Sequence, residues 1–233
     1  MRSPYAVAPR ERSDWLGASR IRKRKEYMNI LKFITCPIQV NTYLAYDETK
    51  EGFIVDPGGY SPLLTQKAKE ENIEVAYIIL THGHADHIGG VDDFLKDFPS
   101  AKVVAYEAER EMLMDSNLNV SLEICGKPVI VDADIYVKDR ENLTVGNTAL
   151  TFIHTPGHTK GGMSIITDGA VFSGDTLFRQ SIGRTDFYGG DFGEIINSIK
   201  ERLFVLPDNT MVYPGHMSET TIGYEKEHNP FVR

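Results

Sequence analysis

The sequence predicts an α/β protein with one main domain. From Met28 to the end of the chain, short β-rich runs alternate with segments of helical periodicity, which is the pattern of sheets covered by helices. The 233 residues are 41% hydrophobic and 25% charged, enough for one sizeable core. The longest apolar run, Val75–Leu80, is far shorter than the roughly 20 residues that cross a bilayer. Because Met1–Gln39 also lacks the apolar stretch of a secretory signal, we expect a cytoplasmic location and no membrane segment.

The first half of the domain is expected to begin with two strands, because Ile30, Lys32 and Ile34 form an alternating pattern and Thr42–Tyr46 is strand-like. Ser61 followed by Pro62 is a typical N-cap and first-turn pair for a helix. The continuous apolar run at residues 75–80 predicts a buried strand. The apolar residues from Ile88 to Phe98 that follow it have helical spacing and predict a helix. The expected elements are strands at residues 30–34, 42–46, 52–56, 75–80 and 102–106, and helices at 62–71, 88–98 and 107–114.

The second half repeats this style. Phe192, Ile195, Ile196, Ile199 and Leu203 give one helix a buried apolar face. The expected elements are strands at residues 149–154, 163–167, 170–173 and 210–213, and a helix at 191–204.

Residues Met1–Tyr27 look like an extension of the folded body. They hold eight Lys/Arg against three Asp/Glu, the only tryptophan, Trp15, and no sustained apolar periodicity. We interpret the segment as a disordered tail, an upstream start or a non-native remnant. A basic targeting or docking arm is the alternative. The folded domain is expected to span residues 28–233.

Charge and cysteine content argue against a nucleic-acid partner and against a disulfide framework. Outside the extension, 17 basic and 30 acidic residues give the body a charge near −13, which repels phosphate backbones and disfavours nucleic acid as a partner. Cys36 and Cys125 share no CxxC spacing and are expected to be small buried hydrophobic residues rather than a disulfide framework. The expected partner is a small-molecule substrate, and the oligomeric state is left open.

Three imidazoles and a carboxylate crowd the segment after the strand at 75–80. His82, His84, Asp86 and His87 fall within six consecutive positions, a density that is costly unless a cation binds these side chains. Imidazole and carboxylate together suit Zn²⁺, iron or Mn²⁺ better than Ca²⁺ or Mg²⁺. Histidines two apart on an extended loop point the same way, so His82 and His84 can hold one ion while Asp86 and His87 reach a second.

Three later strands each end in a tight turn and one ligand-type residue. His158 and His216 each follow a Pro-Gly turn, and Asp175 follows Gly174. Taken singly, each is an ordinary turn residue. An open metal site still needs about three protein groups per ion, so together with the first cluster these residues predict a metal centre.

In chain order, these residues resemble the five successive motifs of the metallo-β-lactamase superfamily, and the resemblance covers Met28 to Arg233. It implies an αββα sandwich with two metal ions at one edge between the two sheets. It also implies that Asp56 is a buried carboxylate that supports the ligands without binding metal. By the same resemblance the first ion is held by His82, His84 and His158, the second by Asp86, His87 and His216, and Asp175 bridges both.

Within that superfamily the sequence looks like the single-domain glyoxalase II-like hydrolases. These place an aspartate at the position of Asp175, which zinc β-lactamases usually do not, and residues 174–179, 183–187 and 219–231 are similar to theirs. Full-length glyoxalase II carries a helical C-terminal domain that helps to grip glutathione, whereas 17 residues follow His216 here. We therefore expect modest discrimination among thioesters.

The implied reaction is hydrolysis of a thioester, such as a hydroxyacylglutathione, by a metal-bound hydroxide. Two ions, zinc first with iron or manganese as alternatives, would lower the pKa of a shared water from ~15.7 to near 7, and Asp86 would orient the nucleophile as well as bind metal. A leaving thiol with a pKa of about 8.5 departs as thiolate, whereas an amide nitrogen must first be protonated.

Two rival activities share these motifs. A lactonase needs the same ligands, and a persulfide dioxygenase, which uses a single iron, has a Gly-Arg-Thr-Asp-Phe stretch like residues 183–187. A redox- or metal-sensing protein on the same scaffold has little support, since no flavodoxin-like extension is present in the sequence.

Three further residues fall outside the ligand set. His154 ends a strand and His228 lies in the charged C-terminal tail, and both are interpreted as structural or exposed. Arg184 lies in a Gly-flanked loop and could bind a substrate carboxylate. The equal alternative is that Arg184 braces Asp186 or Asp191.

Overall fold

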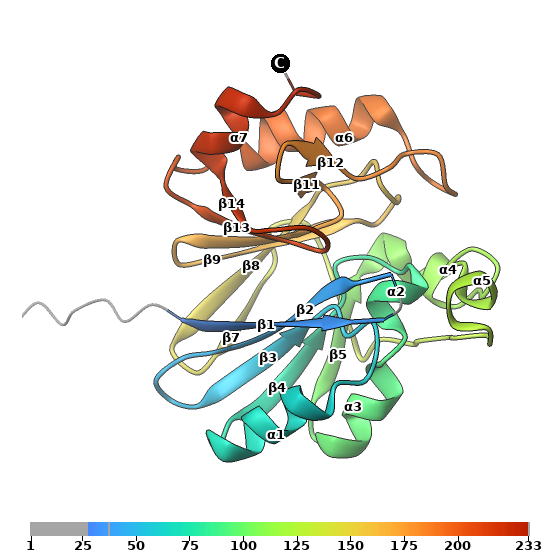
Figure 1. Cartoon of the computed structure of the whole chain (residues 1–233), viewed down its shortest axis with the longest axis vertical. Coiled ribbons are helices and arrows are strands. Elements are labelled where there is room, and N and C mark those ends of the chain that lie inside the picture. Colours follow the sequence, from blue (N-terminus) through green and yellow to red (C-terminus); the bar gives the residue numbers. More distant parts are fainter. Residues whose placement is uncertain (1–27, 37, 233) are drawn as a thin grey trace, which may run out of the picture.

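The computed structural model describes residues 28–36 and 38–232. The expected extension Met1–Tyr27 lies outside the described residues. Within the described part, two six-stranded sheets lie face to face, and helices cover the outer face of each (Figure 1). The α/β class is therefore confirmed, and the arrangement is the αββα sandwich that the resemblance implied.

The first sheet has the strand order β1-β2-β3-β4-β5-β6. Its first three strands pair antiparallel, and β3 to β6 run parallel. Ser61 caps helix α1 by accepting a hydrogen bond from the backbone N of Leu64 at 3.3 Å, as the Ser-Pro pair predicted. The elements of this half are β1 Asn29–Thr35, β2 Val40–Tyr46, β3 Glu51–Val55, α1 Pro62–Glu70, β4 Glu74–Ile79, α2 Ala85–Ile88, α3 Val91–Asp97, β5 Lys102–Tyr106, η1 Glu107–Glu109, α4 Arg110–Leu113, α5 Ser121–Cys125 and β6 Ile135–Val137.

The second sheet has the order β14-β13-β10-β9-β8-β7, and a small β11-β12 hairpin lies beside it. β7 to β10 pair antiparallel, while β10 and β13 run parallel. Asp191 caps α6 by accepting a hydrogen bond from the backbone N of Glu194 at 2.8 Å. The elements of this half are β7 Asn142–Val145, β8 Thr148–His154, β9 Met163–Thr167, β10 Ala170–Gly174, β11 Leu177–Phe178, β12 Ser181–Ile182, α6 Phe192–Ser198, the π-helical turn η2 Ile199–Leu203, β13 Met211–Pro214, β14 Thr220–Thr221 and α7 Ile222–His228.

The core consists of three apolar layers. Leu64 and Phe94 belong to a layer that packs α1 and α3 against the first sheet. Phe53 and Phe172 meet between the two sheets, with ring centroids 5.8 Å apart. Ile195 belongs to the layer between α6 and the second sheet. This packing fixes the two sheets relative to each other, and so it fixes the edge at which their loops meet.

The helix expected at residues 88–98 is interrupted in the structure. Two glycines separate α2 from α3, and the turn after β3 packs against this break. The backbone N of Gly90 donates to O of Pro57 at 2.7 Å, and a Cβ added to Gly89 would lie 2.7 Å from O of Gly58. The loop after β4 is thereby held against the loop after β3.

Other differences concern short elements and the cysteines. The helix expected at 107–114 is a 3-10 turn followed by α4, and the charged tail that holds His228 forms α7. The expectation that Cys36 and Cys125 are buried is wrong, because both are half-buried. Cys36 lies in the β1–β2 turn with a φ of 62°, and Cys125 ends the short helix α5. Among the described residues, no helix is both long and apolar enough to cross a membrane.

Candidate metal centre

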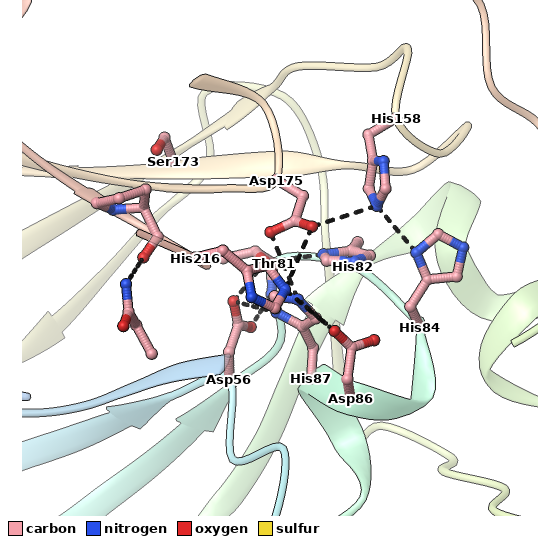
Figure 2. A network of polar contacts seen from close by, with 12 residues as sticks. Asp56, Thr81, His82, His84, Asp86, His87, His158, Ser173, Asp175 and His216 are labelled. Carbon is pink, nitrogen blue, oxygen red and sulfur yellow. Dashed lines mark hydrogen bonds and ion pairs between the residues drawn. The ribbon is translucent and has the colours of Figure 1, made fainter. Parts of the chain in front are cut away.

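Every predicted site residue follows a strand that ends at one edge of the sandwich. Asp56 follows β3 and His82 follows β4 in the first sheet, while His158, Asp175 and His216 come after β8, β10 and β13 in the second. Figure 2 shows these side chains pointing toward one another across the gap between the two sheets. The site is therefore shared by the two halves of the fold.

Gly174 lets the two sheets approach closely at this edge. Its φ is +48°, and a Cβ at this position would lie 2.3 Å from Oγ1 of Thr81. Only glycine has room here and adopts this backbone conformation without cost. Asp175, the next residue, can therefore face the loop that follows β4.

The first group of potential ligands consists of histidines. One nitrogen from each of His82, His84 and His158 falls in a set whose members all lie within 4.8 Å of one another. Nδ1 of His84 lies 2.9 Å from Nε2 of His158. Burial lowers the pKa of all three rings, that of His84 to about 3, and the neighbouring imidazoles add to the effect. These rings are therefore neutral, as metal ligation requires.

The second group mixes one carboxylate with two imidazoles. Oδ2 of Asp86 lies 3.1 Å from Nε2 of His216 and 3.4 Å from Nε2 of His87. Burial acts to lower the pKa of both histidines, but Asp86 and Asp175 outweigh it and raise both values. Conversely, burial acts to raise the pKa of Asp86, and the two histidines lower it. This half of the site therefore attracts positive charge.

Asp175 lies between the two groups. Its Oδ1 is 3.4 Å from Nε2 of His87, and its Oδ2 is 3.7 Å from Nε2 of His158 and 3.7 Å from Nε2 of His216. One carboxylate thus reaches members of both groups.

The residues fit a pair of metal ions. Within the described part of the chain, four buried atoms of this cluster have no hydrogen-bond partner: Nε2 of His82, His84 and His87, and Oδ1 of Asp175. A buried polar atom left unpaired costs about 1–3 kcal/mol, which a bound cation would offset. Imidazole and carboxylate donors suit divalent transition metals. The groups therefore fit a dinuclear metal site.

Residues 37–216 match the family model of the metallo-β-lactamase superfamily. The chain belongs to the metallo-β-lactamase superfamily. A hydroxyacylglutathione hydrolase, GloC of Haemophilus influenzae, is 34% identical over 213 residues, which cover 88% of this chain and 98% of GloC. The solved structure of the BLEG-1 B3 metallo-β-lactamase is 40% identical, with a TM-score of 0.82 over 88% of this chain and 99% of that one. The di-iron-bound form of TTHA1623 is 28% identical, with a TM-score of 0.76 over 86% and 99%.

Asp56 of this superfamily member supports the loop that leads to His82 and His87. Its Oδ1 accepts a hydrogen bond from the backbone N of Thr81 at 2.8 Å, and its Oδ2 accepts from Oγ1 of Thr81 at 2.6 Å. Nδ1 of His87 lies 3.0 Å from the same Oδ2. When Nδ1 donates this bond, Nε2 of His87 remains free to face the site. His158 is oriented similarly, since its Nδ1 donates to O of Arg184 at 2.7 Å.

Glu109 is a buried carboxylate that joins the loops of His82 and His158, and it was not identified from the sequence. Its Oε1 accepts a hydrogen bond from the backbone N of Gly83, between His82 and His84, at 2.9 Å. Its Oε2 accepts from Oγ1 of Thr159, next to His158, at 3.2 Å. Burial raises the pKa of this carboxyl. Its partners lie 26 and 50 residues away, so no local pattern could indicate the role.

The remaining predicted residues contribute no side chain to the two ligand groups. His154 stacks on Tyr106 with ring centroids 4.4 Å apart, and His228 stacks on Tyr224. Arg184 donates through Nε and a terminal nitrogen to both carboxylate oxygens of Asp186, each at 2.7 Å. This pair is the alternative that the sequence left open, and substrate binding by Arg184 stays a prediction.

A cavity of about 490 Å³ opens above the ligand cluster. Its floor includes His84, Asp86, His158, Asp175 and His216. We call the apolar side chains that surround this floor the apolar wall. The apolar wall consists of Ile38, Val120, Ile124, Phe178, Ile182, Phe187 and Met217.

Proposed function

We propose that this protein is a metal-dependent hydrolase that cleaves acyl thioesters, in the manner of a hydroxyacylglutathione hydrolase. The observation that carries the proposal is the cluster of seven imidazole and carboxylate side chains. Four of them hold a buried atom that has no hydrogen-bond partner among the described residues, and five line the floor of one cavity. The similarity to GloC supports the same class of reaction.

In this proposal, His82, His84 and His158 would hold one ion and Asp86, His87 and His216 would hold the other. Asp175, which reaches members of both groups, would serve both. Zinc is the first expectation, with iron or manganese as alternatives. Such ions, when bound, supply Lewis acidity that makes hydroxide available near neutral pH. Asp86 orients the nucleophile, because its carboxylate lies on the cavity floor among the ligands. Asp56 holds His87 in the orientation that ligation needs.

The cavity favours a thioester over an amide. Apart from the ligands, the side chains with hydrogen-bonding groups among its lining residues are Ser181 and Arg184, and Arg184 is held by Asp186. Neither is an acid that gives up a proton near neutral pH. A leaving thiol needs no such donor, because with a pKa of about 8.5 it departs as thiolate. An amide or lactam nitrogen does need one.

A panel of substrates tests the proposal. Protein loaded with Zn²⁺, Fe²⁺ or Mn²⁺ is assayed against lactoylglutathione, a simple lactone, glutathione persulfide and a β-lactam, with metal content measured alongside. The β-lactam is included because of the similarity to BLEG-1. We expect two ions per chain and thioester cleavage well above the other three activities. A protein that binds one iron and consumes oxygen with persulfide, or that opens the lactone or the lactam faster than the thioester, would refute the proposal.

A further inference from the structure

We propose that the apolar wall selects thioesters whose acyl group is an unsubstituted hydrocarbon chain over those with a hydroxylated acyl group. This inference rests on the proposed thioester hydrolysis and adds the class of acyl group. The cavity has a polar floor of ligand residues, and its walls are almost entirely hydrocarbon. Pockets of this kind bind apolar ligand parts by contact and place the reacting group on the few polar residues.

The exposure of the apolar wall supports this inference. The side chains of Ile38 and Met217 are 49% and 56% exposed, and that of Phe187 is 36% exposed. Single exposed apolar residues are common, but a group of them around one opening marks a binding surface. Folding leaves this area in contact with water, and a hydrocarbon chain in the cavity would cover it.

The wall is also tied to the ligand cluster. The ring of Phe187 lies edge-on to His84 with centroids 5.4 Å apart, and that of Phe178 lies edge-on to His216 at 6.1 Å. The backbone N of Ala85 donates to O of Asn119 at 2.9 Å, so the segment that bears Val120 is anchored to the ligand loop. An acyl group bound against these residues would start directly beside the reacting carbonyl.

The backbone of Val120, in the apolar wall, has a strained conformation. Its φ of 54° is left-handed, a conformation that β-branched residues rarely adopt. Such strain persists where the surrounding structure imposes it, often at binding sites. The preceding residue, Asn119, holds this segment on its other side, because its Nδ2 donates to O of Val129 at 2.8 Å.

Above the ligand floor, the described lining residues offer the carboxylates of a thiol carrier no unpaired Lys or Arg side chain. Arg184 is the one such side chain among them, and Asp186 pairs with it through two hydrogen bonds. Its guanidinium also stacks on Phe187 at 3.8 Å from the ring centroid. The carboxylates of a glutathionyl group would have to displace Asp186 to gain this charge. We therefore place the acyl group, and not the thiol carrier, against the apolar wall.

An acyl series on one thiol tests the inference. Acetyl, propionyl, butyryl and hexanoyl esters of glutathione are compared with the lactoyl ester, which is propionyl with an added hydroxyl. We expect kcat/KM to rise about fourfold per methylene until the chain fills the cavity, and propionyl to exceed lactoyl. A flat series, or a kcat/KM for lactoyl equal to or above that for propionyl, would overturn the inference while leaving thioester hydrolysis intact.

A binding measurement keeps the inference independent of turnover. S-methylglutathione and S-hexylglutathione are thioethers that cannot be hydrolysed, and their Kd values for the metal-loaded protein are compared by calorimetry. We expect tighter binding of the hexyl compound by a similar factor per methylene, even if no thioester is cleaved. Equal Kd values would overturn the inference.

Two variants on one helix identify the surface involved. Ile124→Ser changes the apolar wall, whereas Leu122→Ser changes an exposed apolar residue, 46% exposed, on the same helix but outside the cavity lining. We expect Ile124→Ser to reduce the hexyl-to-methyl ratio of affinities by about fourfold or more, and Leu122→Ser to preserve it. Equal effects of the two substitutions would show that the wall does not select the chain.

Discussion

Oδ2 of Asp56 lies 3.0 Å from Nδ1 of His87, and both side chains are buried at the metal centre. This contact fixes which nitrogen of His87 faces the other ligands. In Asp56→Asn the charge is lost and the bond to Nδ1 is weakened, so the ring can turn or change tautomer. We expect the affinity for the second ion to fall by about 10- to 100-fold, the usual cost of losing such a partner. Calorimetric titration of metal-free protein with Zn²⁺ measures this.

The first ion provides the internal control for Asp56→Asn. Of the proposed ligands, His87 is the one that hydrogen-bonds Asp56 directly. An asparagine keeps an oxygen that can accept from the backbone N of Thr81, next to His82. The affinity for the first ion, with His82, His84 and His158 as its proposed ligands, is therefore expected to change much less. Loss of both ions together, with an unchanged thermal melting curve, would contradict the specific link between Asp56 and His87.

Glu109 is expected to hold the geometry of the site without contacting its ions. Glu109→Ala leaves the backbone N of Gly83 and the hydroxyl of Thr159 unpaired in a buried place, which costs about 1–3 kcal/mol per group. Glu109→Gln keeps one acceptor oxygen and should lie between Ala and wild type in both free energy of unfolding and Zn²⁺ affinity. Denaturant unfolding and metal titration measure the two. Wild-type metal affinity in Glu109→Ala would show that the carboxylate has no positioning role.

Asp175→Ala is expected to abolish hydrolysis while the fold remains intact, because this carboxylate reaches both ligand groups. His154→Ala is the matched comparison, since His154 stacks on Tyr106 outside the cluster and should lose little activity. Thioester turnover of both variants, with circular dichroism to monitor folding, checks the pair. If Asp175→Ala turned over within about tenfold of wild type, or if His154→Ala were inactive, our view of the site would be wrong.

Metal loading is expected to release protons. Nearby carboxylates raise the pKa of His87 and His216, so in the metal-free protein these rings keep their protons to a higher pH than an ordinary imidazole. Metal binds the neutral ring. The affinity for the second ion should therefore rise as pH increases through these raised values and fall as pH decreases.

Calorimetry in buffers of different protonation enthalpy measures this proton release directly. We expect Zn²⁺ to bind more weakly at about pH 6 than at about pH 8, with a heat that depends on the buffer at the lower pH. His84 should contribute little to it, since its pKa of about 3 leaves it neutral throughout. Binding that is independent of both pH and buffer would contradict the electrostatic description of the second group.

The sequence predicted the long strands and the residues at their ends, because both follow local rules. Buried strands such as β4 and β5 are rich in apolar residues, and the ligand-type residues lie in the segments that follow strands. The short elements escaped prediction for physical reasons. Helix α5 has five residues, too few for a periodic pattern, and the glycines at 89 and 90 split a helix that apolar spacing alone made continuous.

The site was predictable only in part, because ligand residues form a recognisable sequence pattern and the residues that support them do not. Metal ligands need particular residue types, and His82 to His87 form an unusual cluster. Glu109 and Arg184 depend on partners brought together by folding. The pairing of Arg184 with Asp186 was one of two alternatives, and the atoms around Glu109 come from loops far apart in the sequence.

The floor and the apolar wall of the cavity are formed largely by different segments of the chain. Most ligands lie on loops fixed by the two sheets, while much of the apolar wall lies in the β1–β2 turn, on α5 and in the segment from Phe178 to Phe187. Replacing single wall side chains therefore need not remove a ligand. Natural divergence or directed evolution could thus change which molecules this scaffold accepts by exchanging a few of these side chains, while the backbone contacts that orient the ligands, such as that of the Arg184 carbonyl with His158, are kept.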